Sequence, residues 1–158
     1  MATPSLAEIA VRIESPRQDD VMALLSALDA YLEALYPPIS NHILSIETLC
    51  APNVRFFVAR RDAAALGCGA LLIEQAGTAE VKRMFVAPAA RGQGVGSQIL
   101  RCIEERAARE GLALLRLETG IHQAGAQALY RAFGYVVCGP FGKYCADPRS
   151  VFMQKQLQ

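Results

Sequence analysis

A glycine-rich turn in the middle of the chain is the feature with the clearest chemical meaning. The segment Arg91-Gly92-Gln93-Gly94-Val95-Gly96 follows a predicted strand and directly precedes a predicted helix. Such a turn places a run of backbone N–H groups at the positive end of a helix dipole, and glycines let a phosphate approach without a clashing Cβ. The residues from Arg91 to Ser97 therefore predict an anion-binding cradle that acts mainly through the main chain.

The spacing of the glycines excludes two common phosphate-binding signatures. A dinucleotide-binding fingerprint, G-x-G-x-x-G, counted from Gly92 would need a third glycine where Ser97 stands. A phosphate loop of the kinase or GTPase type would need Gly-Lys-Ser/Thr, which the sequence lacks. The cradle is therefore of another kind.

A second block of residues gives the turn a family context. The turn fits the pattern Q/R-x-x-G-x-G/A through Arg91, Gly94 and Gly96, and Val86-x-Pro88 precedes it. A later pattern, N-x-x-A-x-x-L-Y-x-x-x-G-F, is met with Gln for Asn and Tyr for Phe at its ends by Gln123, Ala126, Leu129, Tyr130, Gly134 and Tyr135. Together the two blocks resemble the GNAT superfamily of acetyl-coenzyme-A-dependent N-acetyltransferases, over about residues 9 to 158.

The resemblance implies acetyl-CoA as the acyl donor, with no metal. It places the pyrophosphate on the main chain of the turn and the pantetheine arm beside Gln123, whose amide reaches one methylene further than the family's Asn. It also implies that backbone N–H groups polarise the thioester carbonyl where one strand separates from its neighbour. The residues expected to bind the cofactor are Met84, Phe85, Val86, Arg91, Gly92, Gln93, Gly94, Val95, Gly96, Ser97 and Gln123.

Proton transfer needs further side chains. A lysine-like amine has a reference pKa of ~10.4 and is almost wholly ammonium at neutral pH, so a base or a water relay must take up its proton. Glu80 is the first candidate base, with an ordinary solvated strand carboxylate as its alternative, and Glu118 is the reserve. Tyr130 matches the family's tyrosine that gives a proton to the coenzyme A sulfur, and its alternative is a core tyrosine on a helix face.

The acceptor site follows only from the resemblance, because in this superfamily the first helix, the segment after it and the loops beyond the central strands line the pocket. Each candidate has an alternative as a surface, capping or core residue: Tyr31, Tyr36, His42, Glu118, Thr119, His122 and Tyr144. Three functions remain open. They are N-acetylation of a small amine or amino acid by direct attack in a ternary complex, acetylation of a protein lysine or N-terminus, and noncatalytic sensing of acyl-CoA.

The amino-acid composition limits the classes of partner that the protein is expected to bind. The chain has 158 residues, 16 basic and 15 acidic, for a net charge of +1, so it lacks the field that would favour nucleic acid or a membrane surface. We expect a single cytoplasmic N-acetyltransferase domain over residues 1–158, with residues 1–8 flexible. The five cysteines contain no C-x-x-C pair, which argues against zinc, and Cys68 and Cys102 read as buried thiols. The expected partner is a small-molecule amine. Exposed edge strands and Phe141 could also support a homodimer.

Hydrophobic periodicity predicts the elements that must position these residues. Strands are expected at Ile9–Glu14, Val54–Arg60, Leu66–Gln75, Ala79–Val86, Leu112–Glu118, Tyr135–Cys138 and Val151–Leu157. Helices are expected from Ser15 to Pro37, around Ile46–Cys50, from the glycine turn to Gly111, and at Gln123–Phe133. Ser15, Pro16 and Gln18 together predict a capping box for the first helix. The fold class is α/β (α+β): a GNAT-type single domain with a mixed central sheet of about six to seven strands, three forming an antiparallel meander, flanked by about four helices.

Overall fold

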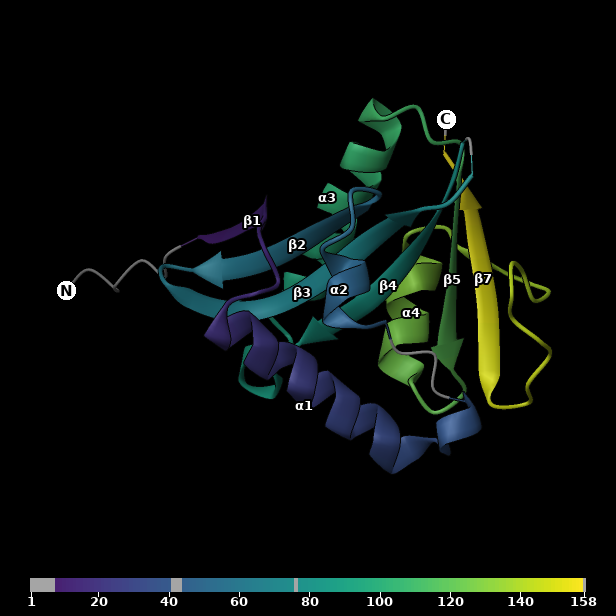
Figure 1. Ribbon diagram of the computed structural model, residues 1–158, viewed down its shortest axis with the longest axis horizontal. Coiled ribbons are helices and arrows are strands. Elements are labelled where there is room, and N and C mark those ends of the chain that lie inside the picture. Colours follow the sequence, from purple (N-terminus) through teal and green to yellow (C-terminus); the bar gives the residue numbers. More distant parts are fainter. Residues whose placement is uncertain (1–7, 41–43, 76, 158) are drawn as a thin grey trace.

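Seven strands form one mixed sheet in the computed structural model, which describes residues 8–40, 44–75 and 77–157 (Figure 1). The strands are β1 (Ile9–Ile13), β2 (Val54–Arg61), β3 (Ala64–Ile73), β4 (Thr78–Val86), β5 (Leu114–Gly120), β6 (Val136–Cys138) and β7 (Ser150–Gln156). Their order across the sheet is β1-β2-β3-β4-β5-β7-β6. Only β4 and β5 pair in parallel among these strands; the other neighbours are antiparallel. The predicted meander of β2, β3 and β4 and the mixed sheet are confirmed.

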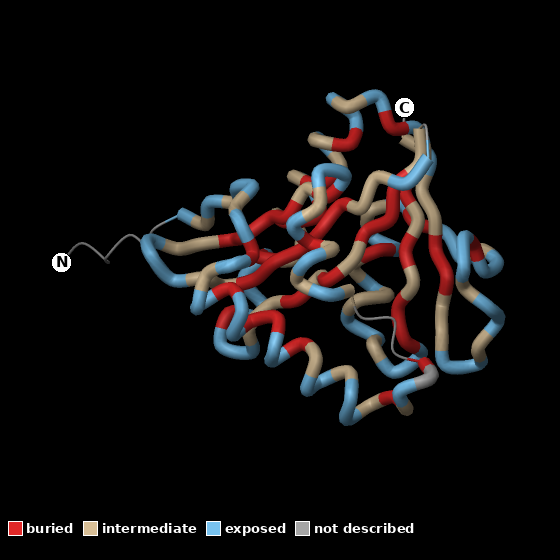
Figure 2. The backbone as a smooth tube through the Cα atoms, viewed as in Figure 1, coloured by how far each residue is buried: buried red, intermediate tan, exposed pale blue. Residues whose placement is uncertain are grey.

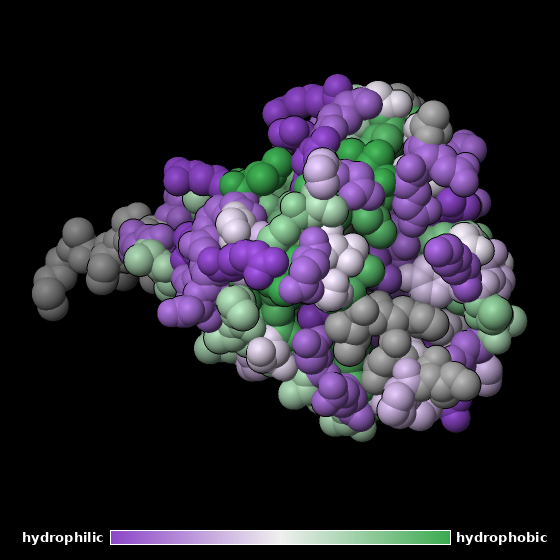
Figure 3. Space-filling view, in the orientation of Figure 1, coloured by the Kyte–Doolittle hydropathy of each residue, from purple (hydrophilic) through white to green (hydrophobic). Residues whose placement is uncertain are grey.

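Helices cover both faces of the sheet. The helical elements are α1 (Asp19–Leu35), η1 (Pro38–Ser40), α2 (Ile46–Leu49), η2 (Pro88–Ala90), α3 (Val95–Arg109) and α4 (Ala124–Ala132). Buried residues of α1 and α2 pack on one face of β2 and β3, while α3 and Tyr130 of α4 pack on the other face (Figure 1). The buried positions follow the central strands between these layers (Figure 2). On the face seen in Figure 3, hydrophilic residues surround most of the outline and apolar residues form a band over the middle of the sheet.

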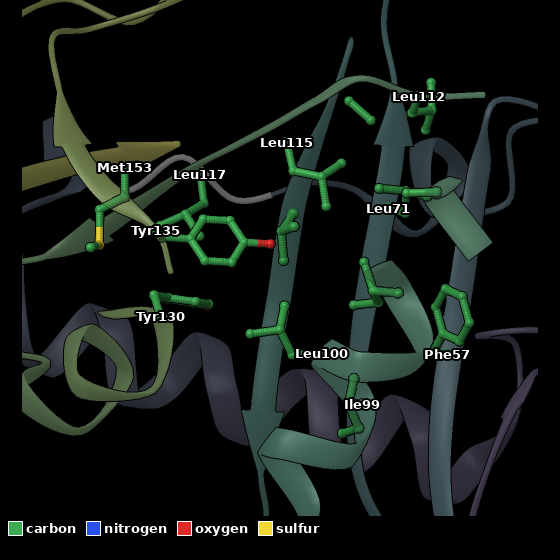
Figure 4. Close-up of a cluster of buried hydrophobic side chains, with 14 of the residues drawn as sticks. Phe57, Leu71, Ile99, Leu100, Leu112, Leu115, Leu117, Tyr130, Tyr135 and Met153 are labelled. Carbon is green, nitrogen blue, oxygen red and sulfur yellow. The ribbon is translucent and has the colours of Figure 1, made fainter. Parts of the chain in front are cut away.

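The larger core lies between the sheet and α3. Ile99, Leu100 and Ile103 of α3 are completely buried against strand residues such as Leu71 and Leu115 (Figure 4). Ile99 and Leu100 lie four and three residues before Ile103, so all three share the side of the helix that faces the sheet. Cys68 is buried as expected, and Cys102 is only partly buried where it packs against this core.

The first helix begins later than the sequence predicts. Gln18, not Ser15, occupies the N-cap position of α1, and the hydroxyl of Ser15 instead accepts a hydrogen bond from the backbone N–H of Arg17 at 3.1 Å. The side chain of Gln18 donates to Glu14 Oε1 at 3.0 Å and accepts from Arg60 Nη2 at 3.2 Å. The predicted capping box is wrong because the glutamine that should close it is held by this charged pair.

Strands β4 and β5 are joined only at their beginnings. The ladder runs from Thr78 opposite Leu114 to Glu80 opposite Arg116, and beyond it the two strands diverge (Figure 1). Within β4, Arg83 has a φ of 58°, and the pairing of β3 with β4 shifts register at the same level. A bulge of this kind bends a strand and increases its local twist. The sheet is therefore split in its centre, with α1 on one side of the opening and α4 on the other.

Phe141 does not offer the dimer surface expected from the sequence. It is 7% exposed, and its ring packs edge-on against Tyr144 at 5.1 Å and Phe152 at 5.8 Å. That expectation is wrong because the segment before β7 folds back on the sheet and buries the ring. Residues 1–7 of the segment expected to be flexible, and His42, lie outside the described residues. In the described part of the chain, no helix is long and apolar enough to cross a membrane.

Candidate functional site

A groove of about 610 Å³ follows the glycine turn and continues between β4 and α4. Ten of the eleven residues expected to bind the cofactor line it: Met84, Phe85, Val86, Arg91, Gly92, Gly94, Val95, Gly96, Ser97 and Gln123. The exception is Gln93, whose side-chain amide donates to the carbonyl of Ala89 at 3.4 Å. Residues from both sequence blocks thus line one groove, although the blocks are some thirty positions apart in the chain.

The backbone of the turn requires glycine. Gly92 and Gly94 have φ angles of 77° and 80°, in the left-handed region that side chains with a Cβ disfavour. A Cβ built on either residue would meet no protein atom within 4 Å, so the space in front of the turn is open. Gly94 is the N-cap of α3, and the first N–H groups of a helix have no partner within it. The turn therefore directs backbone N–H donors at a groove large enough for an extended ligand with phosphate groups.

Arg91 connects the turn to the end of β4. Its Nε donates to the carbonyl of Val86 at 3.2 Å, and its guanidinium lies 5.7 Å from the centre of the Phe85 ring. These contacts hold the turn and the strand end against each other at the mouth of the groove. The arginine also adds a positive charge beside the predicted phosphate site.

A second, smaller cavity of about 90 Å³ lies where β4 and β5 diverge. Its walls come from α1, η1, β4, β5, α4 and the start of β7, and they include Tyr36, Ser40, Lys82, Arg83, Glu118, Thr119, Arg149 and Ser150. The groove and this cavity share the lining residues Leu28, Met84, Gln123, Ala126 and Tyr130. A ligand in the groove and a second ligand in the cavity would therefore meet at this shared wall.

Tyr130 and Glu118 face this region with shifted proton affinities. Tyr130 is 5% exposed, and burial raises the pKa of its hydroxyl above the ordinary value, so the hydroxyl stays protonated at neutral pH. Burial also raises the pKa of Glu118 to about 7, against an opposing effect of the positive charge of Lys82. The Glu118 carboxyl is therefore partly ionised at neutral pH and can take up a proton there.

Glu80 takes another position. It is 4% exposed, it accepts a short hydrogen bond from the hydroxyl of Tyr144, and Lys82 Nζ lies 3.4 Å from its Oε1. Lys82 Nζ also donates to Tyr144 Oη at 2.6 Å. Within the described part of the chain, neither Glu80 nor Tyr144 is among the residues that line the two cavities. Glu80 is thus not the solvated carboxylate weighed as its alternative, and it supports Lys82 from behind the cavity wall.

Tyr36 links the end of α1 to the turn between β5 and α4. Its hydroxyl donates to Gln123 Oε1 at 3.4 Å and accepts from the backbone N–H of His122 at 3.3 Å, and the two rings of Tyr36 and His122 stack at 6.0 Å. Gln123 Oε1 also accepts from the N–H of Gly120 at 2.9 Å. Because the oxygen of Gln123 is used inside the protein, its amide N–H groups are the part that can meet a ligand.

The remaining acceptor candidates divide between the two cavities. Thr119 is buried and lines the smaller cavity, whereas Tyr31 and His122 line the groove. The sequence reasoning missed three cationic residues of the smaller cavity: Lys82, Arg83 and Arg149. The only signal for Lys82 was its position two residues from Glu80, which places both on one face of a strand. Nothing in the sequence indicated the other two.

The described residues contain no group of three or more His, Cys, Asp or Glu side chains that could hold a metal ion.

Comparisons with known proteins agree with this geometry. The model of the acetyltransferase (GNAT) family matches residues 21–135. The chain is 50% identical over 150 residues to the IAA acetyltransferase of Azospirillum brasilense, covering 94% of this chain and 98% of the relative.

Among solved structures, an acyl-CoA N-acyltransferase from Klebsiella pneumoniae superposes with a TM-score of 0.81 at 36% identity, over 95% of this chain and 98% of that one. The PaiA N-acetyltransferase of Thermoplasma acidophilum, solved in complex with coenzyme A, has the same fold with a TM-score of 0.70 at 17% identity, over 95% and 99% of the chains.

The family model matches residues 21–135, and the chain folds as a split mixed sheet with a glycine-turn groove beside the split. The chain therefore belongs to the acetyltransferase (GNAT) family. It is an acetyl-CoA-dependent N-acetyltransferase.

Proposed function

We propose that the protein transfers the acetyl group of acetyl-CoA to the primary amine of a small molecule, by direct attack in a ternary complex. The observation that carries this proposal is the meeting of the 610 Å³ groove with the 90 Å³ cavity at Met84, Gln123 and Tyr130. The groove would hold acetyl-CoA with its pyrophosphate on the turn, and the cavity would hold the amine. We further propose that residues 1–158 form a single N-acetyltransferase domain.

Two side chains divide the proton transfers in this proposal. Glu118 takes a proton from the ammonium group of the acceptor, and the free amine nitrogen then attacks the thioester carbon. The C–N bond forms as the C–S bond breaks, the second amine proton leaves to solvent, and the departing sulfur receives the proton of the Tyr130 hydroxyl, which solvent restores. Backbone N–H groups of Met84 to Val86, beside the split in the sheet, would polarise the thioester carbonyl.

A small acceptor fits the cavity better than a polypeptide. The cavity is small, and across its edge the hydroxyl of Ser40 donates to Asp147 Oδ2 at 2.5 Å, linking the segment after α1 to the segment before β7. A protein acetyltransferase would need an open groove at this place. The name of the Azospirillum relative, IAA acetyltransferase, also refers to a small acceptor.

The test is a thiol-release assay with acetyl-CoA and a panel of amines, amino acids, polyamines and lysine peptides, with the product identified by mass spectrometry. We expect CoA release that depends on a small amine and an acetylated amine as product. Acetylation of peptides with no turnover of small amines would favour the protein acetyltransferase instead. Tight binding of acetyl-CoA without turnover of any amine would favour a noncatalytic sensor.

A further inference from the structure

We infer that the acceptor is a compact zwitterion, with an anionic group a few bonds from its amine, and that Arg149 binds this anionic group. The inference deepens the proposed function and rests on the smaller cavity being the acceptor site. Two features of that cavity support it: the charged side chains that line its wall, and the ion pairs that each of them already forms.

The cavity wall carries more positive than negative side chains. Its cations are Lys82, Arg83 and Arg149, and its carboxylate is Glu118. Because burial raises the pKa of Glu118 to about 7, even this carboxylate is partly neutral at physiological pH. Each of the three cations has a carboxylate nearby, Glu80, Asp29 or Asp147, so an anionic group of the acceptor needs a cation whose pairing is weak.

The pairing of the cations singles out Arg149. Lys82 is engaged by Glu80 and Tyr144 as described above. Arg83 is 4% exposed in its side chain and forms an ion pair with Asp29 of α1 at 2.5 Å. Arg149 Nη1, in contrast, lies 3.8 Å from Asp147 Oδ1, and its side chain is 47% exposed.

The oxygens of Asp147 also accept from other donors, and its contact with the Arg149 guanidinium is long, at 3.8 Å. Oδ2 accepts from Ser40, and Oδ1 accepts from the backbone N–H of Arg149 at 2.9 Å. The guanidinium of Arg149 is therefore the cavity cation with the weakest pairing within the described residues, and it stands at the solvent side of the cavity. A planar guanidinium fork is well suited to bind a carboxylate or phosphonate through two oxygens.

Arg83 gives a second, independent indication of a polar ligand. Its Nε is buried and has no hydrogen-bond partner within the described part of the chain, although the residue lines the cavity. A buried donor without a partner has lost its hydrogen bonds to water and gained none in return. An oxygen of an anionic ligand would satisfy this donor, whereas an apolar amine would leave it unpaired.

The strand register sets how far apart the two ends of the acceptor can be. The backbone N–H of Ile121 donates to the carbonyl of Arg149 at 2.9 Å. Arg149 therefore lies beside Ile121, which follows β5 and is three residues after Glu118 in the chain. Three strand residues span about 10 Å between backbones, and the two side chains both reach one cavity of about 90 Å³. The amine at Glu118 and the anion at Arg149 are therefore separated by a few bonds, as in an amino carboxylate, aminophosphonate or aminosulfonate.

The test compares acceptors that differ only in the anion. The pairs are alanine with ethylamine, and phenylalanine with 2-phenylethylamine. In addition, 1-aminoethylphosphonate is compared with alanine, to distinguish a phosphonate from a carboxylate. We expect the anionic member of at least one pair to have a kcat/KM higher by about tenfold or more, the effect of one charged hydrogen bond. Equal or better turnover of the uncharged-tail amines would overturn the inference but leave the proposed function standing, whereas failure of every amine would reject the proposed function itself.

Variants separate the role of Arg149 from general effects on the enzyme. Arg149→Gln should raise the KM of the anionic acceptor about tenfold, leave the KM of acetyl-CoA unchanged, and remove the preference within each pair, and Arg149→Lys should restore part of it. Arg101→Gln, at an exposed arginine of α3 outside both cavities, is the control for loss of a positive charge. Titration calorimetry of the anionic acceptor with CoA-saturated protein supplies a readout independent of turnover. If Arg149→Gln weakens both members of a pair equally, Arg149 does not bind the anion.

Discussion

The hydroxyl of Tyr36 occupies the place where a side chain at residue 120 would begin. A Cβ built on Gly120 would lie 1.6 Å from Tyr36 Oη and 2.1 Å from its Cζ. The missing side chain lets the end of α1 close over the end of β5, which brings Tyr36 to Gln123 and the backbone of His122. One wall of the smaller cavity thus depends on a glycine that belongs to neither sequence block.

Gly120→Ala should therefore displace Tyr36. Because the contact atoms belong to a buried ring, we expect a loss of about 1–3 kcal/mol in the free energy of unfolding and a higher KM for the acceptor. Chemical denaturation and steady-state kinetics measure these effects. Gly125→Ala is the matched control, since a Cβ there meets nothing within 4 Å. In a Tyr36→Leu background the cost of Gly120→Ala should shrink, and an unchanged cost would contradict this explanation.

Gly94→Ala should weaken acetyl-CoA binding by more than its backbone strain explains. At a φ of 80° a side chain costs about 1–2 kcal/mol of stability, and the new Cβ also enters the groove. We expect the KM for acetyl-CoA to rise about tenfold, the loss of one hydrogen bond to a charged group. Gly111→Ala has the same strain, with a φ of 77° and open space, but lies outside the groove. A similar KM in both variants would reject the cradle.

Glu118→Gln should remove the acidic limb of the pH–rate profile. With its pKa raised by burial to about 7, Glu118 is protonated and inactive as a base below that pH, so wild-type kcat/KM should fall as the pH drops through about 7. The variant should lose about a hundredfold or more in rate at pH 8. Glu80→Gln is the comparison, because Glu80 was the first candidate from the sequence. If Glu80→Gln, and not Glu118→Gln, abolishes the limb, the base is Glu80.

The same carboxyl should also make the protein less stable as the pH rises. The folded-state pKa of Glu118 lies above the ordinary value of 4.5, so between these two pH values the unfolded chain binds fewer protons than the folded one. Stability then falls with increasing pH and is lowest above pH 7. We expect Glu118→Gln to exceed the wild type by on the order of 2–3 kcal/mol at pH 8 and to match it at pH 4. Urea denaturation at both pH values measures this difference, and equal stability at pH 8 would contradict the burial of the charge.

Tyr130→Phe should lower kcat while leaving acetyl-CoA binding nearly intact. The ring keeps its packing against Tyr135 at 5.7 Å, but the proton for the departing sulfur is lost, which we expect to cost roughly a hundredfold in kcat. Tyr135→Phe makes the same chemical change at a buried tyrosine outside both cavities. Wild-type turnover of Tyr130→Phe would remove this residue from the mechanism.

The parts of the site that were predictable are local in sequence. The cradle consists of consecutive residues whose glycines and following helix determine its conformation, and Tyr130 sits in a block of fixed spacing on one helix. Such features depend on backbone dihedral preferences and helix periodicity, which neighbouring residues decide. The late start of α1 escaped prediction because Gln18 is held by Arg60, more than forty residues away.

The smaller cavity was not predictable in this way, because its walls come from segments between Leu28 and Ser150. They meet only because β4 and β5 pair over three residues and then diverge. Ser40 and Asp147, which join at its edge, have no pattern that connects them in the sequence.

The two glutamates show which part of the site the sequence determines and which part depends on the tertiary structure. The sequence by itself determined the family, the cradle and the presence of Glu80 and Glu118 on central strands. The sequence placed Glu80 first and Glu118 in reserve, but it could not show which of them faces a cavity, because both point to the same face of the sheet: Glu80 lies opposite Arg116, two residues before Glu118. Glu80 lies in the paired part, under the segment that carries Tyr144, whereas Glu118 lies past the last pair and faces the opening. The length of one strand ladder, a property of the folded sheet, decided which carboxylate lines the cavity.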